Sequence, residues 1–144
     1  DKIFIEWTNF GDEYTLKCKD APRPELLSAI SDMAPYWQEI LELEEIKDME
    51  PNVSSISFTS ALGENGSPVI GVTIYASMKL TKGTGVWGAN SPHRIERFYS
   101  DSGGDAGQLM SDNLIDSCKE LLYEAKRYIK GDRAQMSLMD LKAA

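Results

Sequence analysis

The chain has 144 residues and a formal net charge of −8, with 42% hydrophobic and 26% charged residues. These values are typical of one globular domain with its own core. Non-specific nucleic-acid binding depends on phosphate neutralisation by Lys and Arg, so we expect no direct nucleic-acid contact. No apolar run approaches the roughly 20 residues of a membrane span, and no basic start precedes an apolar signal segment. We therefore expect a cytoplasmic protein without membrane contact.

Cysteine and histidine are scarce in this chain. Cys18 and Cys118 lie far apart and have no CxxC-type neighbour, which favours free thiols in a reducing compartment. The single histidine, His93, and the lack of a Cys/His cluster argue against a structural zinc site. We expect no metal site and no cofactor.

Two segments near the start of the chain alternate apolar and polar residues. They are KIFIEW at 2–7 and YTLKCK at 14–19, with the turn signal Gly11-Asp12 between them. Alternation with period two is typical of strands that have one buried face. We predict an antiparallel hairpin here.

An amphipathic helix is predicted next. Apolar residues recur at three- and four-residue spacing over residues 26–40, which forms one stripe on a helix. The helix begins at Asp20 or Pro24, since proline is tolerated in a first turn. Pro35 removes a backbone hydrogen bond and crowds the preceding turn, so we expect a kink or two helical pieces that meet near Ala34.

A second hairpin is predicted from residues 53–61 and 69–80, which are rich in strand-forming residues. Asn65-Gly66 between them is a strong turn cue. Gly71 interrupts the second run, where a glycine weakens a strand or marks a bulge or a close approach.

The remaining chain consists of an irregular segment and a helix. Residues 81–108 contain many glycines and no periodicity, so we expect an irregular loop with a short strand in RIERFY. From Asp112, an N-cap candidate, apolar residues recur at helical spacing up to Gly131, a C-terminal stop. Acidic residues start this helix and basic residues end it, which complements the helix dipole.

The predicted order is therefore β-β-α-β-β-loop-α. The simplest arrangement is an α+β fold, in which an antiparallel four- to five-stranded sheet has helices packed on one face. We expect a single α+β domain over residues 1–131 and a C-terminal tail over residues 132–144. An exposed apolar helix face would also support a homodimer.

One candidate ligand site lies in the loop segment KGTGVWG. Lys82 and the backbone N–H groups of Gly83 and Gly85 are suited to holding an anion, although the phosphate-loop pattern GxxxxGK[ST] is absent. The alternative, which we favour, is a glycine-rich hairpin or lid with Trp87 docked on the core.

His93 and Arg94 place a titrating base beside a fixed cation, a combination that acid–base chemistry uses. No nucleophile or carboxylate partner can be assigned to them from sequence. We therefore name no catalytic residue and favour a non-enzymatic protein. A small-ligand-binding protein or an enzyme that uses residues 82–99 is an alternative.

The C-terminal segment AQMSLMDLKAA gives the clearest functional signal. Gln135-Met136-Ser137-Leu138-Met139 resembles the linear motif by which bacterial proteins dock on the DNA-polymerase sliding clamp. That motif reads glutamine, any residue, serine or aspartate, leucine, then a bulky apolar residue, most often phenylalanine. The resemblance implies that Leu138 and Met139 fill a pocket while Gln135 makes directional hydrogen bonds. Met139 in place of phenylalanine lowers the expected affinity. The alternative is that the segment packs back onto the domain.

A second resemblance concerns the end of the last helix and the sequence YIKGDRAQMSL. It is similar to the ends of small proteins from phage and prophage replication or recombination modules. This implies an accessory protein at the host replication machinery, in the host cytoplasm. We therefore expect a non-enzymatic phage-type adaptor that binds a host protein, with the sliding clamp as the candidate.

A third hypothesis uses the dense carboxylates between residues 39 and 50. Such a run is usually a solvated face. Together with the net charge of −8, it also fits an acidic phage inhibitor of a host defence system, which mimics DNA or blocks a protein. In that case the acidic run matters and the tail does not.

Overall fold

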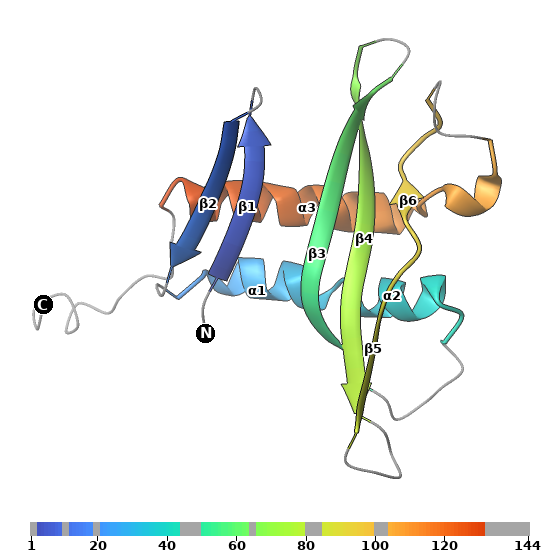
Figure 1. The fold of residues 1–144 in the computed structure, drawn as a ribbon, viewed down its shortest axis with the longest axis horizontal. Coiled ribbons are helices and arrows are strands. Elements are labelled where there is room, and N and C mark those ends of the chain that lie inside the picture. The colour runs from blue at the N-terminus through green and yellow to red at the C-terminus, as the bar shows by residue number, and fades with distance from the viewer. Residues whose placement is uncertain are drawn as a thin grey trace, which may run out of the picture. The chain divides into compact units, whose positions relative to one another are not determined.

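A computed structural model describes residues 3–9, 12–18, 21–43, 50–63, 66–79, 85–99 and 104–131. Its elements are β1 (Ile3–Asn9), β2 (Asp12–Cys18), α1 (Pro24–Ser31), α2 (Ala34–Ile40), β3 (Asn52–Leu62), β4 (Pro68–Lys79), β5 (Val86–Asn90), β6 (Arg94–Ile95), η1 (Ala106–Gln108) and α3 (Asp112–Ile129). Helices and antiparallel strands confirm the α+β class. The strands form a two-stranded sheet, β1-β2, and a four-stranded sheet of β3 to β6 (Figure 1).

The chain divides into two compact units, each described below by itself. Unit 1 consists of residues 1–29 and 121–144, and unit 2 of residues 30–120. The boundaries fall inside α1 and α3. The prediction of one domain over 1–131 with a tail at 132–144 stays a prediction, and the tail lies outside the described residues.

The hairpin of unit 1 matches its sequence prediction. β1 and β2 pair antiparallel from Ile3 opposite Cys18 to Asn9 opposite Asp12. The apolar residues on one face of β1 are only partly buried, and Phe4 on the other face is 54% exposed. The ammonium of Lys17 lies 5.6 Å from the centre of the Phe4 ring. Among the side chains of this hairpin that the structure describes, none is fully buried.

Helix α3 presents the predicted apolar stripe. Its most buried members are Leu114, Cys118, Leu121 and Tyr128. The prediction of Asp112 as the N-cap is wrong by one residue, because the hydroxyl of Ser111 accepts a hydrogen bond from the Leu114 N–H at 3.2 Å. A serine oxygen caps free helical N–H groups at that position.

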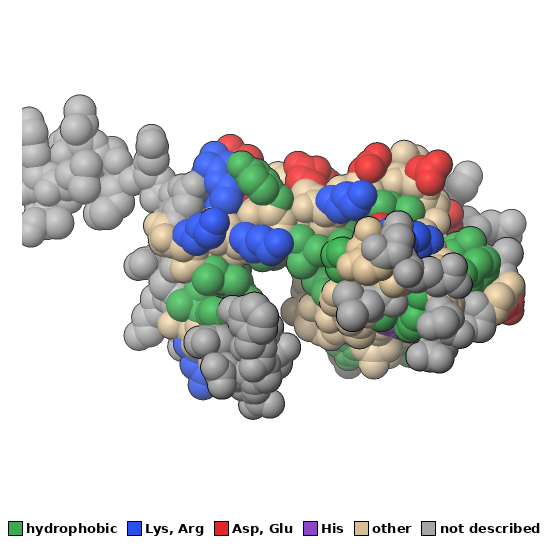
Figure 2. All heavy atoms as spheres, turned by 90° about the horizontal axis from the view of Figure 1, so that it is seen from above, with side chains coloured by type: hydrophobic (Ala, Val, Ile, Leu, Met, Phe, Trp, Pro, Cys, Tyr) green, Lys and Arg blue, Asp and Glu red, His purple; other side chains and the backbone are tan. Residues whose placement is uncertain are grey.

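The C-terminal end of α3 follows the predicted stop and charge pattern. Gly131 has φ 104°, the left-handed conformation that ends many helices. Lys126 and Arg127 lie in the last turn, where positive charge stabilises the helix dipole. On unit 1, Figure 2 shows basic side chains around a hydrophobic patch. The guanidinium of Arg127 lies 5.5 Å from the ring centre of Tyr123.

The predicted break near Ala34 is confirmed. α1 begins at Pro24 and ends at Ser31, and α2 begins at Ala34. Pro35 sits in the first turn of α2, where its missing N–H has no helical partner to lose. The residues of the predicted stripe are therefore divided between two short helices, with Leu26 and Ala29 buried in α1 and Trp37 buried in α2.

Strand β4 is the centre of unit 2. β3 pairs antiparallel along one side of β4, and β5 and β6 pair along the other. Val72, Ile74, Ala76 and Met78 alternate along β4 as buried residues. From α2, Trp37 is fully buried, and its indole N–H donates to the Ala89 carbonyl at 2.9 Å. These contacts form the core of the unit.

Strands β5 and β6 form an interrupted edge. Asn90 pairs with Tyr75 and Arg94 pairs with Val72, so three residues on the edge face two residues of β4. Pro92 lies in this bulge, and proline in sheets is confined to edges and bulges because it lacks an N–H. The expectation of irregular chain over 81–108 is therefore wrong at β5, while the short strand in RIERFY is confirmed as β6.

Candidate functional site

The interrupted edge is held to β4 by side chains that replace missing backbone partners. The Ser91 N–H donates to the Ile74 carbonyl at 2.7 Å, and the Ser91 hydroxyl accepts from the Ile74 N–H at 2.9 Å. Farther along, the Glu96 N–H donates to the Ile70 carbonyl, and the Glu96 carboxylate accepts from the Ile70 N–H, both at 2.9 Å. These bonds fix the residues between Ser91 and Glu96.

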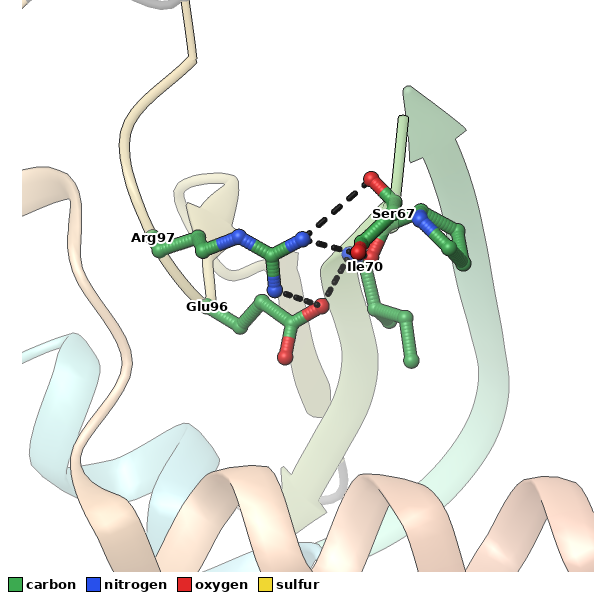
Figure 3. Close-up of polar contacts among 5 residues, drawn as sticks. Ser67, Ile70, Glu96 and Arg97 are labelled. Carbon is green, nitrogen blue, oxygen red and sulfur yellow. Dashed lines mark hydrogen bonds and ion pairs between the residues drawn. The ribbon is translucent and has the colours of Figure 1, made fainter. Parts of the chain in front are cut away.

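Arg97 completes this attachment. Figure 3 shows its guanidinium reaching from the edge segment to the start of β4. It donates to the carbonyls of Ser67 and Pro68, each at 3.2 Å, and lies 3.5 Å from the Glu96 carboxylate. Arg97 thus has partners for both of its terminal nitrogens, and it links the β3–β4 turn to the edge.

His93 lies on the sheet face opposite to the core. One ring nitrogen, Nε2, is 3.1 Å from the Thr59 hydroxyl, and the other, Nδ1, is 3.0 Å from the Thr73 hydroxyl. In a neutral imidazole one nitrogen donates and the other accepts, and each threonine hydroxyl can do either. The three side chains come from β3, β4 and the bulge, which are far apart in sequence.

Gly71 makes room for this cluster. A Cβ atom on Gly71 would collide with the His93 ring and with the Thr59 hydroxyl. The predicted close approach at this glycine is therefore confirmed, and the approaching groups are His93 and Thr59.

The chemistry available to the His93 cluster is limited. A catalytic histidine is normally oriented by a carboxylate and acts on a positioned nucleophile. Among the residues that the structure describes, no carboxylate hydrogen-bonds to the His93 ring. The cluster provides hydrogen-bonding groups on an exposed face, and the absence of an orienting carboxylate gives no support to nucleophilic catalysis there.

Arg94 does not share a site with His93. It lines a pocket of about 220 Å³ in unit 2 between α2, the start of α3 and β6. Neighbouring strand residues point to opposite faces, so the sequence pair His93-Arg94 is divided between the two faces of the sheet. The Arg94 guanidinium donates a hydrogen bond to the main-chain carbonyl of His93 at 3.2 Å. The two side chains do not hydrogen-bond to each other.

The pocket combines charged, hydroxyl and apolar side chains. Its apolar part consists of Ile40, Leu109, Met110 and Leu114, and its polar part consists of Tyr36, Glu39, Glu42, Arg94 and Ser111. Of these residues, only Arg94 belongs to the site predicted from sequence. The others approach it from α2 and from the start of α3.

The rest of the predicted loop site is divided as well. Trp87 is 42% exposed, and its ring centre lies 5.8 Å from that of the buried Trp37. This contact agrees with the interpretation of Trp87 as docked on the core. Gly85 directly precedes β5 and is exposed. Lys82 and Gly83 lie outside the described residues, and so the anion-loop hypothesis stays a prediction.

The predicted partner-binding residues Gln135, Ser137, Leu138 and Met139 also lie outside the described residues. Of the acidic run, residues 39–43 and Glu50 are described, and both Glu39 and Glu42 are exposed. The clamp and inhibitor hypotheses therefore stay predictions.

Cys118 is buried and inert. Burial, with a smaller contribution from the negative charge of Glu96, raises the pKa of its thiol from 9.0 to about 12. Because the thiolate is the reactive form, Cys118 is a packing residue at neutral pH. Over the described part of the chain, no three His, Cys, Asp or Glu side chains are grouped as metal ligands would be.

The sequence signals missed most of these neighbours. Thr59 and Thr73 stand in polar positions of alternating strands, which any solvated face also shows. Gly71 was the available hint, since it indicated a close approach without naming the group that approaches. Tyr36 and Ser111 carried no signal, and Glu39 stood out only as part of the acidic run, because only the packing of α2 and the start of α3 brings them near Arg94.

Comparison with known proteins gives no further guidance: no protein family, curated protein or solved structure is significantly similar to this chain. In the described ranges, no helix is both long and apolar enough to cross a membrane.

Proposed function

We propose that this chain is a non-enzymatic accessory protein that binds another protein through residues 135–139, with the bacterial sliding clamp as the candidate partner. The observation that carries the proposal is the order Gln135-Met136-Ser137-Leu138-Met139. A short peptide of this kind binds by inserting apolar anchors into a groove while polar groups fix its direction.

The end of α3 is compatible with this use. The helix ends at Ile129, and Gly131 adopts a left-handed conformation. The motif therefore lies after the end of α3 in the sequence. Leu138 and Met139 are not needed to complete the periodic pattern that buries α3.

The protein would act by occupying the peptide-binding groove of the clamp. The segment brings the folded units to a clamp on replicating DNA, or it keeps other proteins out of the same groove. The resemblance of the sequence YIKGDRAQMSL to the ends of phage and prophage proteins supports action in the cytoplasm of a bacterial host. The net charge of −8 disfavours direct competition for DNA phosphates, so recruitment would depend on the protein contact.

The test is calorimetric titration of the full chain into a purified bacterial sliding clamp. We expect binding that is lost with Leu138→Ala and Met139→Ala together. Met136→Ala is the matched control, because it removes a similar apolar side chain at the motif position that accepts any residue. Met139→Phe should strengthen binding by several-fold to tenfold, about 1 kcal/mol.

Two results would overturn the proposal. One is the absence of binding by a folded full-length chain. The other is equal weakening by Met136→Ala and by the double substitution, which would show a general apolar contact without the motif's register. Circular dichroism of each variant checks that the fold is intact.

A further inference from the structure

The pocket around Arg94 holds charges of both signs that do not pair with each other. Arg94 makes one hydrogen bond, to the His93 carbonyl, and in the described residues no carboxylate lies within 4.0 Å of it. Glu39 and Glu42 line the same pocket and are exposed. Arginine has five N–H donors in a planar fork that matches a carboxylate. Most of that capacity remains open to a ligand.

Arg97, in the same segment, is an arginine whose hydrogen bonds stabilise the fold. Its terminal nitrogens are bonded to two carbonyls and lie close to the Glu96 carboxylate. Arg94, three positions earlier, has no comparable set of partners. The contrast separates an arginine that holds the fold from one that is open to a ligand.

Glu42 occupies an unusual backbone position. Its φ is 60°, and its N–H and that of Leu43 bond back to the carbonyls of Glu39 and Gln38, which closes the end of α2. Glycine is preferred at this left-handed position, since a Cβ there costs about 1 kcal/mol. In this protein the position is occupied by Glu42, which lines the pocket. Its left-handed conformation lowers the stability of the fold.

Two hydroxyl groups add donors. The Tyr36 hydroxyl accepts from Ser117 at 3.3 Å, and the Ser111 oxygen accepts from the Leu114 N–H. Each of these hydroxyls therefore still has its own hydrogen to donate. The donors of Arg94, Tyr36 and Ser111 and the acceptors of Glu39 and Glu42 border the apolar surface of the pocket.

The pocket is of a size that suits a small ligand. Its volume is about 220 Å³, several times the space that one water molecule needs. A single amino acid is a molecule of this size.

We propose that this pocket binds a small zwitterion, specifically a free α-amino acid with an apolar side chain. Its carboxylate would pair with Arg94, its ammonium would lie between Glu39 and Glu42, and its side chain would cover the apolar surface. This ligand uses every kind of group in the pocket. An amine alone would leave Arg94 without an anion, and an acid alone would meet two glutamates. The proposal is independent of the clamp-binding segment.

The test is calorimetric titration of the full chain with L-leucine and with two molecules that each lack one of its charged groups. Isopentylamine is leucine without the carboxylate, and 4-methylpentanoic acid is leucine without the ammonium. We expect leucine to bind at least tenfold more tightly than either. Arg94→Gln should weaken leucine binding at least tenfold, and Glu39→Gln with Glu42→Gln should do the same.

His93→Gln is the matched control, because it changes the neighbouring side chain on the other face of the sheet and leaves the pocket intact. It should bind leucine as the unchanged protein does. The proposal is overturned if leucine does not bind, if isopentylamine binds equally well, or if Arg94→Gln binds leucine without loss. Thermal unfolding of each variant confirms that its fold is retained.

Discussion

The two β-hairpins of this protein have similar sequence patterns and very different surroundings. In β1–β2, the described apolar side chains are partly buried or exposed. In β3–β4, the β4 strand buries Val69, Val72, Ile74, Ala76 and Met78. A two-stranded hairpin is marginal by itself, whereas a sheet with a packed face is stable. Alternation thus predicts strand pairing in both hairpins. It does not predict which hairpin contributes more to the free energy of unfolding through apolar burial.

The comparison has an energetic basis. Burying one large apolar side chain contributes about 1.5–3 kcal/mol. Unit 2 gains this repeatedly along β4 and again from Trp37, and its edge segment is fixed by the side chains of Ser91 and Glu96. The first of the next three experiments tests this difference directly, and the other two test local features of unit 2.

The largest effect is expected at the two tryptophans that represent the hairpin and the core. Trp37→Ala removes a fully buried ring and the hydrogen bond to the Ala89 carbonyl, and it should cost about 3–5 kcal/mol. Trp7→Ala in the partly buried β1 should cost less than half of that. Urea unfolding followed by circular dichroism measures both. Equal losses would show that the hairpin contributes as much as the core.

An intermediate effect is expected at Gly71. Gly71→Ala places a methyl group against His93 and Thr59 and should cost about 1–3 kcal/mol through overpacking. Adding His93→Ala should recover part of the loss. Gly104→Ala is the control, since nothing lies within 4 Å of its added Cβ. If Gly71→Ala is neutral in the same unfolding assay, the His93 cluster does not constrain the sheet.

The smallest effect is expected at Glu42 and has the opposite sign. Glu42→Gly relieves the positive φ of 60° and should stabilise the protein by up to about 1 kcal/mol. Glu39→Gly, in the last turn of α2, should destabilise it by up to about 1 kcal/mol, because glycine is unfavourable at helical positions. Differential scanning calorimetry compares the two. A loss of stability with Glu42→Gly would contradict the strain at this position.

The local patterns predicted much of the fold. Period-two alternation located four strands, helical spacing located the buried stripes, and Pro35 predicted the break between α1 and α2. These features depend on neighbouring residues. β5 was missed because Val86-Trp87-Gly88 does not alternate clearly, and its strand form depends on pairing with β4.

The site was less predictable. His93 and Arg94 stood out because of their chemistry, yet as neighbours in an extended segment they point to opposite faces of the sheet. The partners of each come from other elements, Thr59 and Thr73 in one case and Glu39 and Ser111 in the other. These contacts depend on how distant elements of the chain pack together, which cannot be deduced from a single sequence.

The bulge at Ser91–His93 has a practical consequence for experiments. His93 is the only histidine in the chain, so its imidazole proton resonances can be assigned without site-directed labelling. Its carbonyl accepts the hydrogen bond from Arg94, while its ring touches the hydroxyls of Thr59 and Thr73. A ligand that binds the Arg94 guanidinium would alter the hydrogen bond to this carbonyl. The resonances of His93 would then serve as a nuclear magnetic resonance probe of the pocket, in the residue next to Arg94.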